Sequence, residues 1–152
     1  MVSEIIPLGS PPTDATSVLV VGTDDWAIEQ GVAAVERAGY QVARCHEPGE
    51  PAFPCNGLRP DRGCPLDRGV GVVVTMRGRP VAPPPLEEFG VVCAVHAGVP
   101  LVVAGLTERN PLAAWSTVVV ARSEDLATAI GRVTERLSRK GAAKQPAGRA
   151  TP

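Results

Sequence analysis

Short runs of aliphatic residues, separated by segments with helical spacing, constrain the fold of this chain more than any other feature. The apolar runs cover residues 18–21, 72–74, 101–103 and 118–120, and a shorter alternating run covers 40–43. Consecutive apolar residues are typical of strands that are buried on both faces, and strands that alternate with helices form parallel sheets. We therefore predict an α/β fold with a doubly wound, five-stranded parallel sheet in the order 2-1-3-4-5.

The helix expected over residues 86–97 is apolar on most of its sides. Leu86, Phe89 and Cys93 lie on one stripe with helical spacing, which His96 or Ala97 continues. We expect this helix to be heavily buried, with Cys93 in the core. Two glutamates at positions 87 and 88 lie near its start, where a negative charge favours the helix dipole.

The segment 45–68 interrupts the alternation of strands and helices. It reads CHEPGEPAFPCNGLRPDRGCPLDR, with five prolines and three cysteines, and no helical pattern runs through it. A doubly wound fold places its second helix in this interval. We expect an ordered loop rich in cysteine and proline to replace or shorten that helix, because a structureless loop of this length is uncommon in a compact domain.

Length and charge suggest one domain without a nucleic-acid or membrane partner. The 152 residues carry a net charge of −1, and no apolar stretch is long enough to span a bilayer. The first ten residues lack the basic region of a signal peptide, so we expect a cytoplasmic protein. We divide the chain into a flexible arm (1–16), the α/β domain (17–140) and a disordered tail (141–152), with Ser123 capping the last helix.

The cysteine-rich loop leaves three interpretations open. Cys45, His46, Cys55 and Cys64 provide enough ligands for zinc, although no two of them have the close spacing of a zinc knuckle. A disulfide between Cys55 and Cys64 would stabilise the loop by roughly 2–3 kcal/mol and would act as a redox switch in a reducing compartment. In the third interpretation, these thiols pack as small apolar groups.

Polar residues follow the first and third predicted strands, where ligands of this fold class bind. Asp24 and Asp25 follow the first strand; they can meet a cation or a hydroxyl-bearing ligand there, or cap the next helix. Thr75 ends the third strand and Arg77 comes just after it, where a guanidinium can receive a phosphate or carboxylate. Neither the G-x-G-x-x-G fingerprint nor the Walker A pattern is present.

The order of elements over residues 17–139 resembles the receiver domain of bacterial response regulators. The resemblance implies a flavodoxin-like fold, an acidic pair after the first strand and a phosphoryl-accepting Asp at the end of the third. Here Asp24 and Asp25 are displaced past the strand by two residues, and Thr75 stands in place of the accepting Asp. The chain is therefore more similar to a pseudo-receiver, which implies regulation through protein contacts. The stretches FPCNGL, GCPLD and VPLVVAGL are similar to those of actinobacterial proteins of this size, and this likeness implies no activity.

Two classes of function remain. The first is a non-catalytic receiver-like module that binds a protein partner or a second copy of itself, with no cofactor. It predicts an exposed patch between Leu106 and Trp115, in which Trp115 is the interface anchor. The second is a thiol-redox or zinc-binding sensor built on Cys45, Cys55 and Cys64.

Overall fold

Five parallel strands form a single sheet in the order β2-β1-β3-β4-β5, as predicted. The computed structural model describes residues 16–81, 83–105, 110–122 and 125–144. The strands are β1 (Ser17–Gly22), β2 (Gln41–Ala43), β3 (Val70–Arg77), β4 (Leu101–Gly105) and β5 (Val118–Val120). Because β1 and β3 are central, their residues face apolar side chains on both sides of the sheet, which explains their continuous valine runs.

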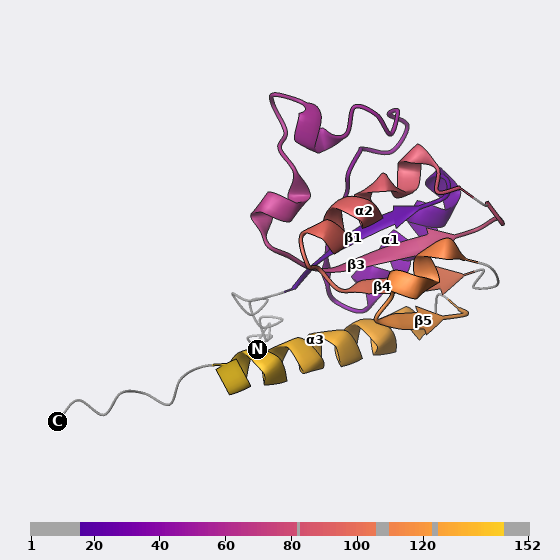
Figure 1. The fold of residues 1–152 in the computed structure, drawn as a ribbon. Coiled ribbons are helices and arrows are strands. Elements are labelled where there is room, and N and C mark those ends of the chain that lie inside the picture. Colours follow the sequence, from indigo (N-terminus) through magenta and orange to yellow (C-terminus); the bar gives the residue numbers. More distant parts are fainter. Residues whose placement is uncertain (1–15, 82, 106–109, 123–124, 145–152) are drawn as a thin grey trace, which may run out of the picture.

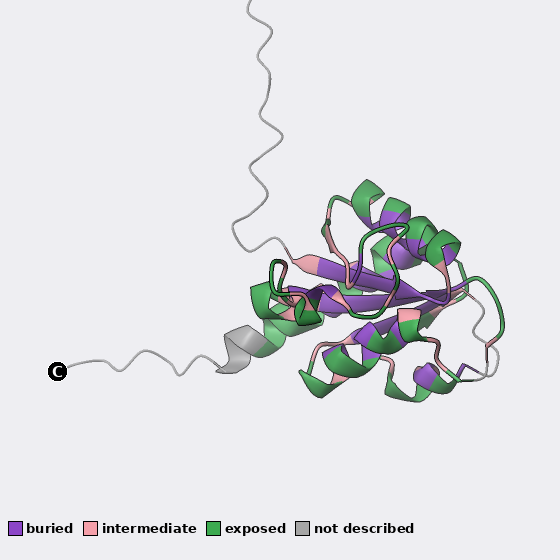
Figure 2. Ribbon diagram, turned by 90° about the horizontal axis from the view of Figure 1, so that it is seen from above, coloured by how far each residue is buried: buried purple, intermediate pink, exposed green. Residues whose placement is uncertain are grey.

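Helices cover the two faces of the sheet unequally (Figure 1). The helices α1 (Asp25–Arg37) and α3 (Leu126–Lys144) pack on one face, in a core that includes Val20, Val74 and Ile130. The shorter α2 (Phe89–His96) packs on the other face, over Leu19, Val73 and Val103. Figure 2 shows the buried strands between these two layers. Alternate residues of β1, β3 and β4 therefore belong to separate cores.

As predicted, an ordered loop replaces the second helix of a doubly wound fold. Its only regular elements are the 3₁₀ turns η1 (Asn56–Leu58) and η2 (Pro65–Arg68). Asn56 anchors it: its backbone N–H donates to the carbonyl of Cys45 at 2.7 Å, and its side chain donates to the carbonyl of Arg44 at 3.3 Å. Arg62 donates to both carboxylate oxygens of Glu50, at 2.5 and 2.9 Å. Polar contacts thus give this loop the order that a helix would otherwise supply.

The expected orientation of α2 is wrong. The helix buries Gly90, Val91 and Ala94, whereas the stripe of Leu86, Phe89, Cys93 and His96 is exposed. The reason is steric, since a Cβ at Gly90 would lie 2.7 Å from the sulfur of Cys45 and 2.9 Å from Val21. The helix approaches the sheet so closely at this point that glycine is required at position 90.

The chain ends depart in part from the expected division. Helix α3 continues to Lys144, so residues 141–144 of the predicted tail are helical. The arm up to residue 15, the tail from residue 145 and the predicted cap Ser123 lie outside the described residues. Among the described residues, no helix has the length and apolar character needed to cross a bilayer.

Candidate functional site

A buried ion pair lies where β3 ends. Arg77 donates to Glu88 through Nε at 3.0 Å and through Nη2 at 2.8 Å, and the hydroxyl of Thr75 donates to the same carboxylate at 2.9 Å. The remaining Nη1 of Arg77 donates to the carbonyl of Val81 at 2.6 Å. Glu88 is fully buried and belongs to η3 (Leu86–Glu88), directly before α2. The pair therefore connects the end of β3 to the start of α2.

The residues after β1 are fastened to those after β3. The N–H of Thr23 donates to the carbonyl of Met76 at 3.1 Å, and the hydroxyl of Thr23 accepts from the N–H of Gly78 at 3.3 Å. A Cβ at Gly22 would lie 2.8 Å from the carbonyl of Met76. These contacts join the ends of β1 and β3 at the place where ligands of this fold class bind.

The two aspartates after β1 have different surroundings. Asp24 is the N-cap of α1 and accepts from the N–H of Ala27 at 2.8 Å, which agrees with the capping interpretation. Its second oxygen lies 3.5 Å from Nε of Arg79. Asp25 is mostly exposed and lies 3.8 Å from Nε2 of the buried His46. Each carboxylate therefore has its own basic neighbour.

The four cysteines are free thiols. Cys45, Cys55 and Cys64 are half-buried, whereas Cys93 is exposed, so its predicted place in the core is wrong. Burial raises the pKa of Cys45 from its ordinary value of 9.0 to about 12, and the nearby thiols of Cys55, Cys64 and Cys93 act in the same direction. Among the described residues, no three His, Cys, Asp or Glu side chains are arranged to hold a metal ion.

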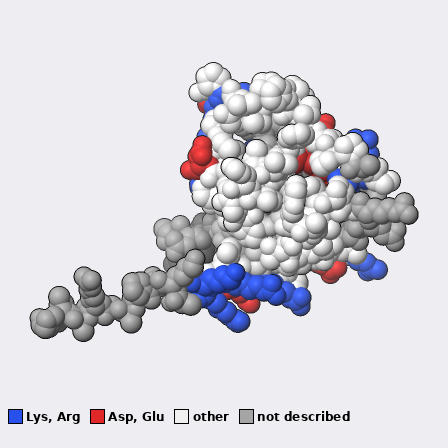
Figure 3. Space-filling model, viewed as in Figure 1, with Lys and Arg blue, Asp and Glu red and all other residues white. Residues whose placement is uncertain are grey.

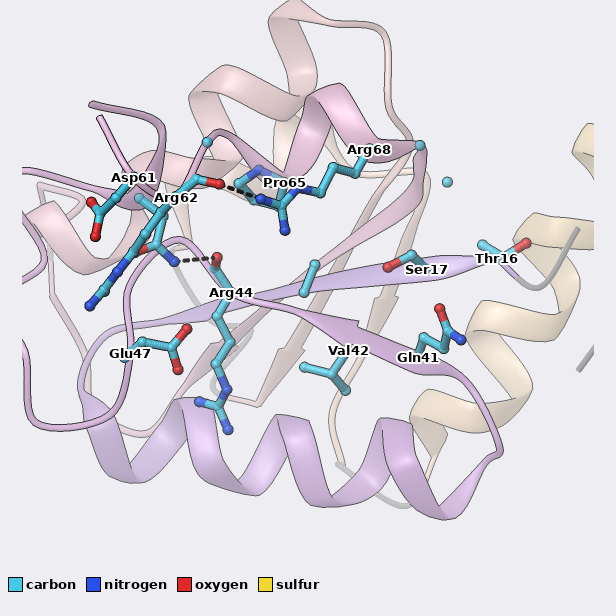
Figure 4. Close-up of a pocket in the computed structure, with 15 residues that line it drawn as sticks. Thr16, Ser17, Gln41, Val42, Arg44, Glu47, Asp61, Arg62, Pro65 and Arg68 are labelled. Atoms are coloured by element: carbon cyan, nitrogen blue, oxygen red, sulfur yellow. Dashed lines mark hydrogen bonds between the residues drawn. The ribbon is translucent and has the colours of Figure 1, made fainter. Parts of the chain in front are cut away.

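A groove of about 1190 Å³ opens at the amino end of β1 and β2, beside the loop that replaces the second helix (Figure 4). Sheet residues that line it, such as Ser17 and Gln41, are small or polar. Its arginines are engaged: Arg44 pairs with Glu29 at 2.7 Å, Arg62 pairs with Glu50, and Arg68 donates to the carbonyl of Arg62. The groove follows from the missing helix, and its basic groups serve the loop.

Bulky apolar side chains are exposed along α2 and its preceding turn. We call the set of Leu86, Phe89 and Val92 the α2 face; these residues are 57, 51 and 42 % exposed. Figure 3 shows that most of the side of the molecule carrying α2 is free of charged side chains, with a few acidic and basic groups beside this region and at the margins. Trp115, the predicted anchor, is 56 % exposed in η4 (Pro111–Trp115). The first residues of the predicted patch, 106–109, lie outside the described residues.

The comparisons with known proteins leave the family open. No protein-family model matches this chain, and neither a curated protein nor a solved structure matches it. Its function must therefore be argued from its own residues.

Glu88 is the residue whose place at this edge the sequence did not indicate. From the sequence, Glu88 is only an acidic residue near the start of a helix. In the structure it is the fully buried partner of Arg77. The one available signal was that the neighbouring stripe positions, Leu86 and Phe89, are apolar. If helical spacing places Leu86 and Phe89 on the exposed side, Glu88 lies on the side that faces the sheet.

Proposed function

We propose that this chain is a non-catalytic receiver-like module that acts by binding protein through its α2 face. Its partner on that face is a second copy of the chain.

Support for the absence of phosphoryl transfer comes from the end of β3. The resemblance to receivers implies an accepting Asp at the position of Thr75, and the hydroxyl of Thr75 is instead buried and donates to Glu88. Arg77, the guanidinium at the same strand end, is engaged by the same carboxylate. A phosphoryl group needs a free nucleophile and an unengaged cation, and these residues provide neither.

The observation that carries the proposal is the exposure of large apolar side chains on and beside α2. The helix buries Gly90, Val91 and Ala94 against the sheet, whereas its Phe89 and Val92, and Leu86 in the preceding turn, lie toward the surface. Stability alone favours the opposite arrangement, because burying a large apolar side chain contributes roughly 1.5–3 kcal/mol. Contiguous exposed apolar side chains are typical of protein-binding sites.

The lack of charge on this face favours a second copy as the occupant. Two copies that meet through a symmetric interface bring each residue near its own equivalent, so like charges would repel. The α2 face contains only aliphatic and aromatic side chains, and most of the surface on this side is uncharged (Figure 3). Two α2 faces therefore meet without placing a charged side chain of the face against its own equivalent.

Sedimentation velocity of the full chain tests this proposal over a range of protein concentrations. We expect a monomer–dimer equilibrium with a dissociation constant in the micromolar range, and loss of the dimer in Phe89→Glu. Trp26→Glu is the matched control, because Trp26 is also an exposed aromatic residue but lies on α1, in the layer on the opposite face of the sheet. The dimer of this variant should match that of the unmodified chain.

Two results would refute the proposal. One is an unmodified chain that remains monomeric at the highest concentration. The other is a dimer that Trp26→Glu weakens as much as Phe89→Glu does.

A further inference from the structure

The thiols of Cys55, Cys64 and Cys93 lie near enough to Cys45 to raise its pKa, so the cysteines gather where the loop 45–68 packs beside α2. The sulfur of Cys45 lies against Gly90, since a Cβ at Gly90 would be 2.7 Å from it. Cys93 is one helical turn further along α2. The carbonyl of Cys45 accepts from the N–H of Asn56 at 2.7 Å, which brings the neighbouring Cys55 to the same place.

Cys55 and Cys64 flank the closed neck of a small loop. The N–H of Gly63 donates to the carbonyl of Asn56 at 3.1 Å, so the residues that adjoin the two cysteines are hydrogen-bonded to each other. A Cβ at Gly57 would lie only 3.0 Å from Cβ of Cys64. The backbone segments that carry Cys55 and Cys64 therefore run side by side, joined by the residues next to each cysteine.

We propose that Cys55 and Cys64 form a redox-active dithiol, which a hydroperoxide converts reversibly into a disulfide. One thiol attacks the peroxide oxygen and becomes a sulfenic acid, and the peroxide leaves as water or an alcohol. The second thiol then displaces hydroxide from the sulfenic sulfur, which releases a water molecule and forms the S–S bond. A dithiol reductant returns both sulfurs to thiols.

The other two cysteines fit this role less well. Cys45 is half-buried like Cys55 and Cys64, but burial raises its pKa and so disfavours the reactive thiolate. Cys93 is exposed but is fixed on α2, outside the hydrogen-bonded neck. Cys55 and Cys64 are both half-buried, so a small peroxide can reach them, and each precedes a short 3₁₀ turn.

Peptide mapping of the full chain tests the proposal. The reduced protein is treated with hydrogen peroxide, its remaining thiols are alkylated, and tryptic peptides are analysed without reduction. Trypsin cuts after Arg44, Arg62 and Arg68, so peptides 45–62 and 63–68 separate unless a disulfide joins them. We expect the joined pair, a mass two hydrogens lower, and full reversal by dithiothreitol.

Four single variants assign the bond. Cys55→Ser and Cys64→Ser should lose the joined peptides, whereas the controls Cys45→Ser and Cys93→Ser should keep them. Fragmentation of the joined peptides from the unmodified chain assigns the sulfur to Cys55 or to Cys45, so the test does not depend on how well the variants fold.

Three outcomes would overturn the proposal: four free thiols after peroxide treatment, a bond that persists in Cys55→Ser, or a stoichiometric metal ion that protects the thiols. None of them bears on the α2 face, because the sedimentation experiment uses reduced protein.

Discussion

Removing the carboxylate of Glu88 should destabilise the protein more than any other single change at the carboxyl edge of the sheet. In Glu88→Ala, the guanidinium of Arg77 stays buried and loses two hydrogen bonds, at 3.0 and 2.8 Å, keeping only its bond to a backbone carbonyl. The hydroxyl of Thr75 loses its acceptor as well. Breaking a buried ion pair by removing one partner costs about 3–5 kcal/mol. We expect a loss of unfolding free energy in that range.

Removing both Arg77 and Glu88 separates the interaction of the pair from the cost of each single change. In the double variant Arg77→Met/Glu88→Leu no buried charge is left, and apolar replacement of a buried pair is often close to neutral. The double variant should therefore be more stable than the sum of the two single effects by at least about 2 kcal/mol. Arg79→Ala is the matched control, since Arg79 is 58 % exposed and 3.5 Å from Asp24, and should cost less than about 1 kcal/mol.

Urea denaturation followed by far-UV circular dichroism measures these differences, provided that the dependence on urea is the same in all variants. A cost below about 1 kcal/mol for Glu88→Ala would contradict the assignment of a buried, fully engaged pair. Strict additivity in the double variant would show that the two side chains do not interact.

Three further predictions follow from local geometry. Asp24→Ala removes the acceptor that caps α1 and should lower the unfolding free energy by about 1 kcal/mol, as measured by urea denaturation. Gly105→Ala places a Cβ 2.3 Å from the carbonyl of Arg77 at a φ of +92°, whereas Gly39→Ala, at φ +87° with open space around it, adds only strain. The thermal midpoint of Gly105→Ala should therefore fall well below that of Gly39→Ala, and equal midpoints would refute the steric argument. The pKa of Cys45 rises from 9.0 to about 12 on folding, so the unfolded chain loses this proton first as the pH rises. Stability should then fall between about pH 9 and pH 12, and Cys45→Ala should make that fall shallower in urea midpoints measured at several pH values.

The sheet was predictable because its signal is carried by consecutive residues. The valine runs at 18–21 and 72–74 require two covered faces, and only the central strands of a doubly wound sheet have them. The missing second helix was equally visible, since prolines recur through 45–68. The cap at Asp24 follows from its position just before a helical pattern.

The side of α2 that faces the sheet was not predictable from periodicity. The helix carries apolar residues on both sides, so the spacing identifies a stripe but not its direction. Side-chain size decides the matter, because Gly90 is the residue that fits between Cys45 and Val21. The partnership of Arg77 and Glu88 was hidden for a different reason: it depends on how the segment between β3 and α2 returns to the strand, and no local pattern encodes that path.

The position of the ion pair also bears on how the proposed module works. Glu88 is the residue directly before α2, and its carboxylate is held by the end of β3, so the pair fixes the start of the helix that carries Phe89 and Val92. This connection between strand and helix is made by the chain's own residues. We infer that dimer formation is constitutive. Glu88→Gln, which keeps the shape of the side chain and weakens the pair, should therefore weaken the dimer in sedimentation experiments although residue 88 is buried and does not belong to the α2 face.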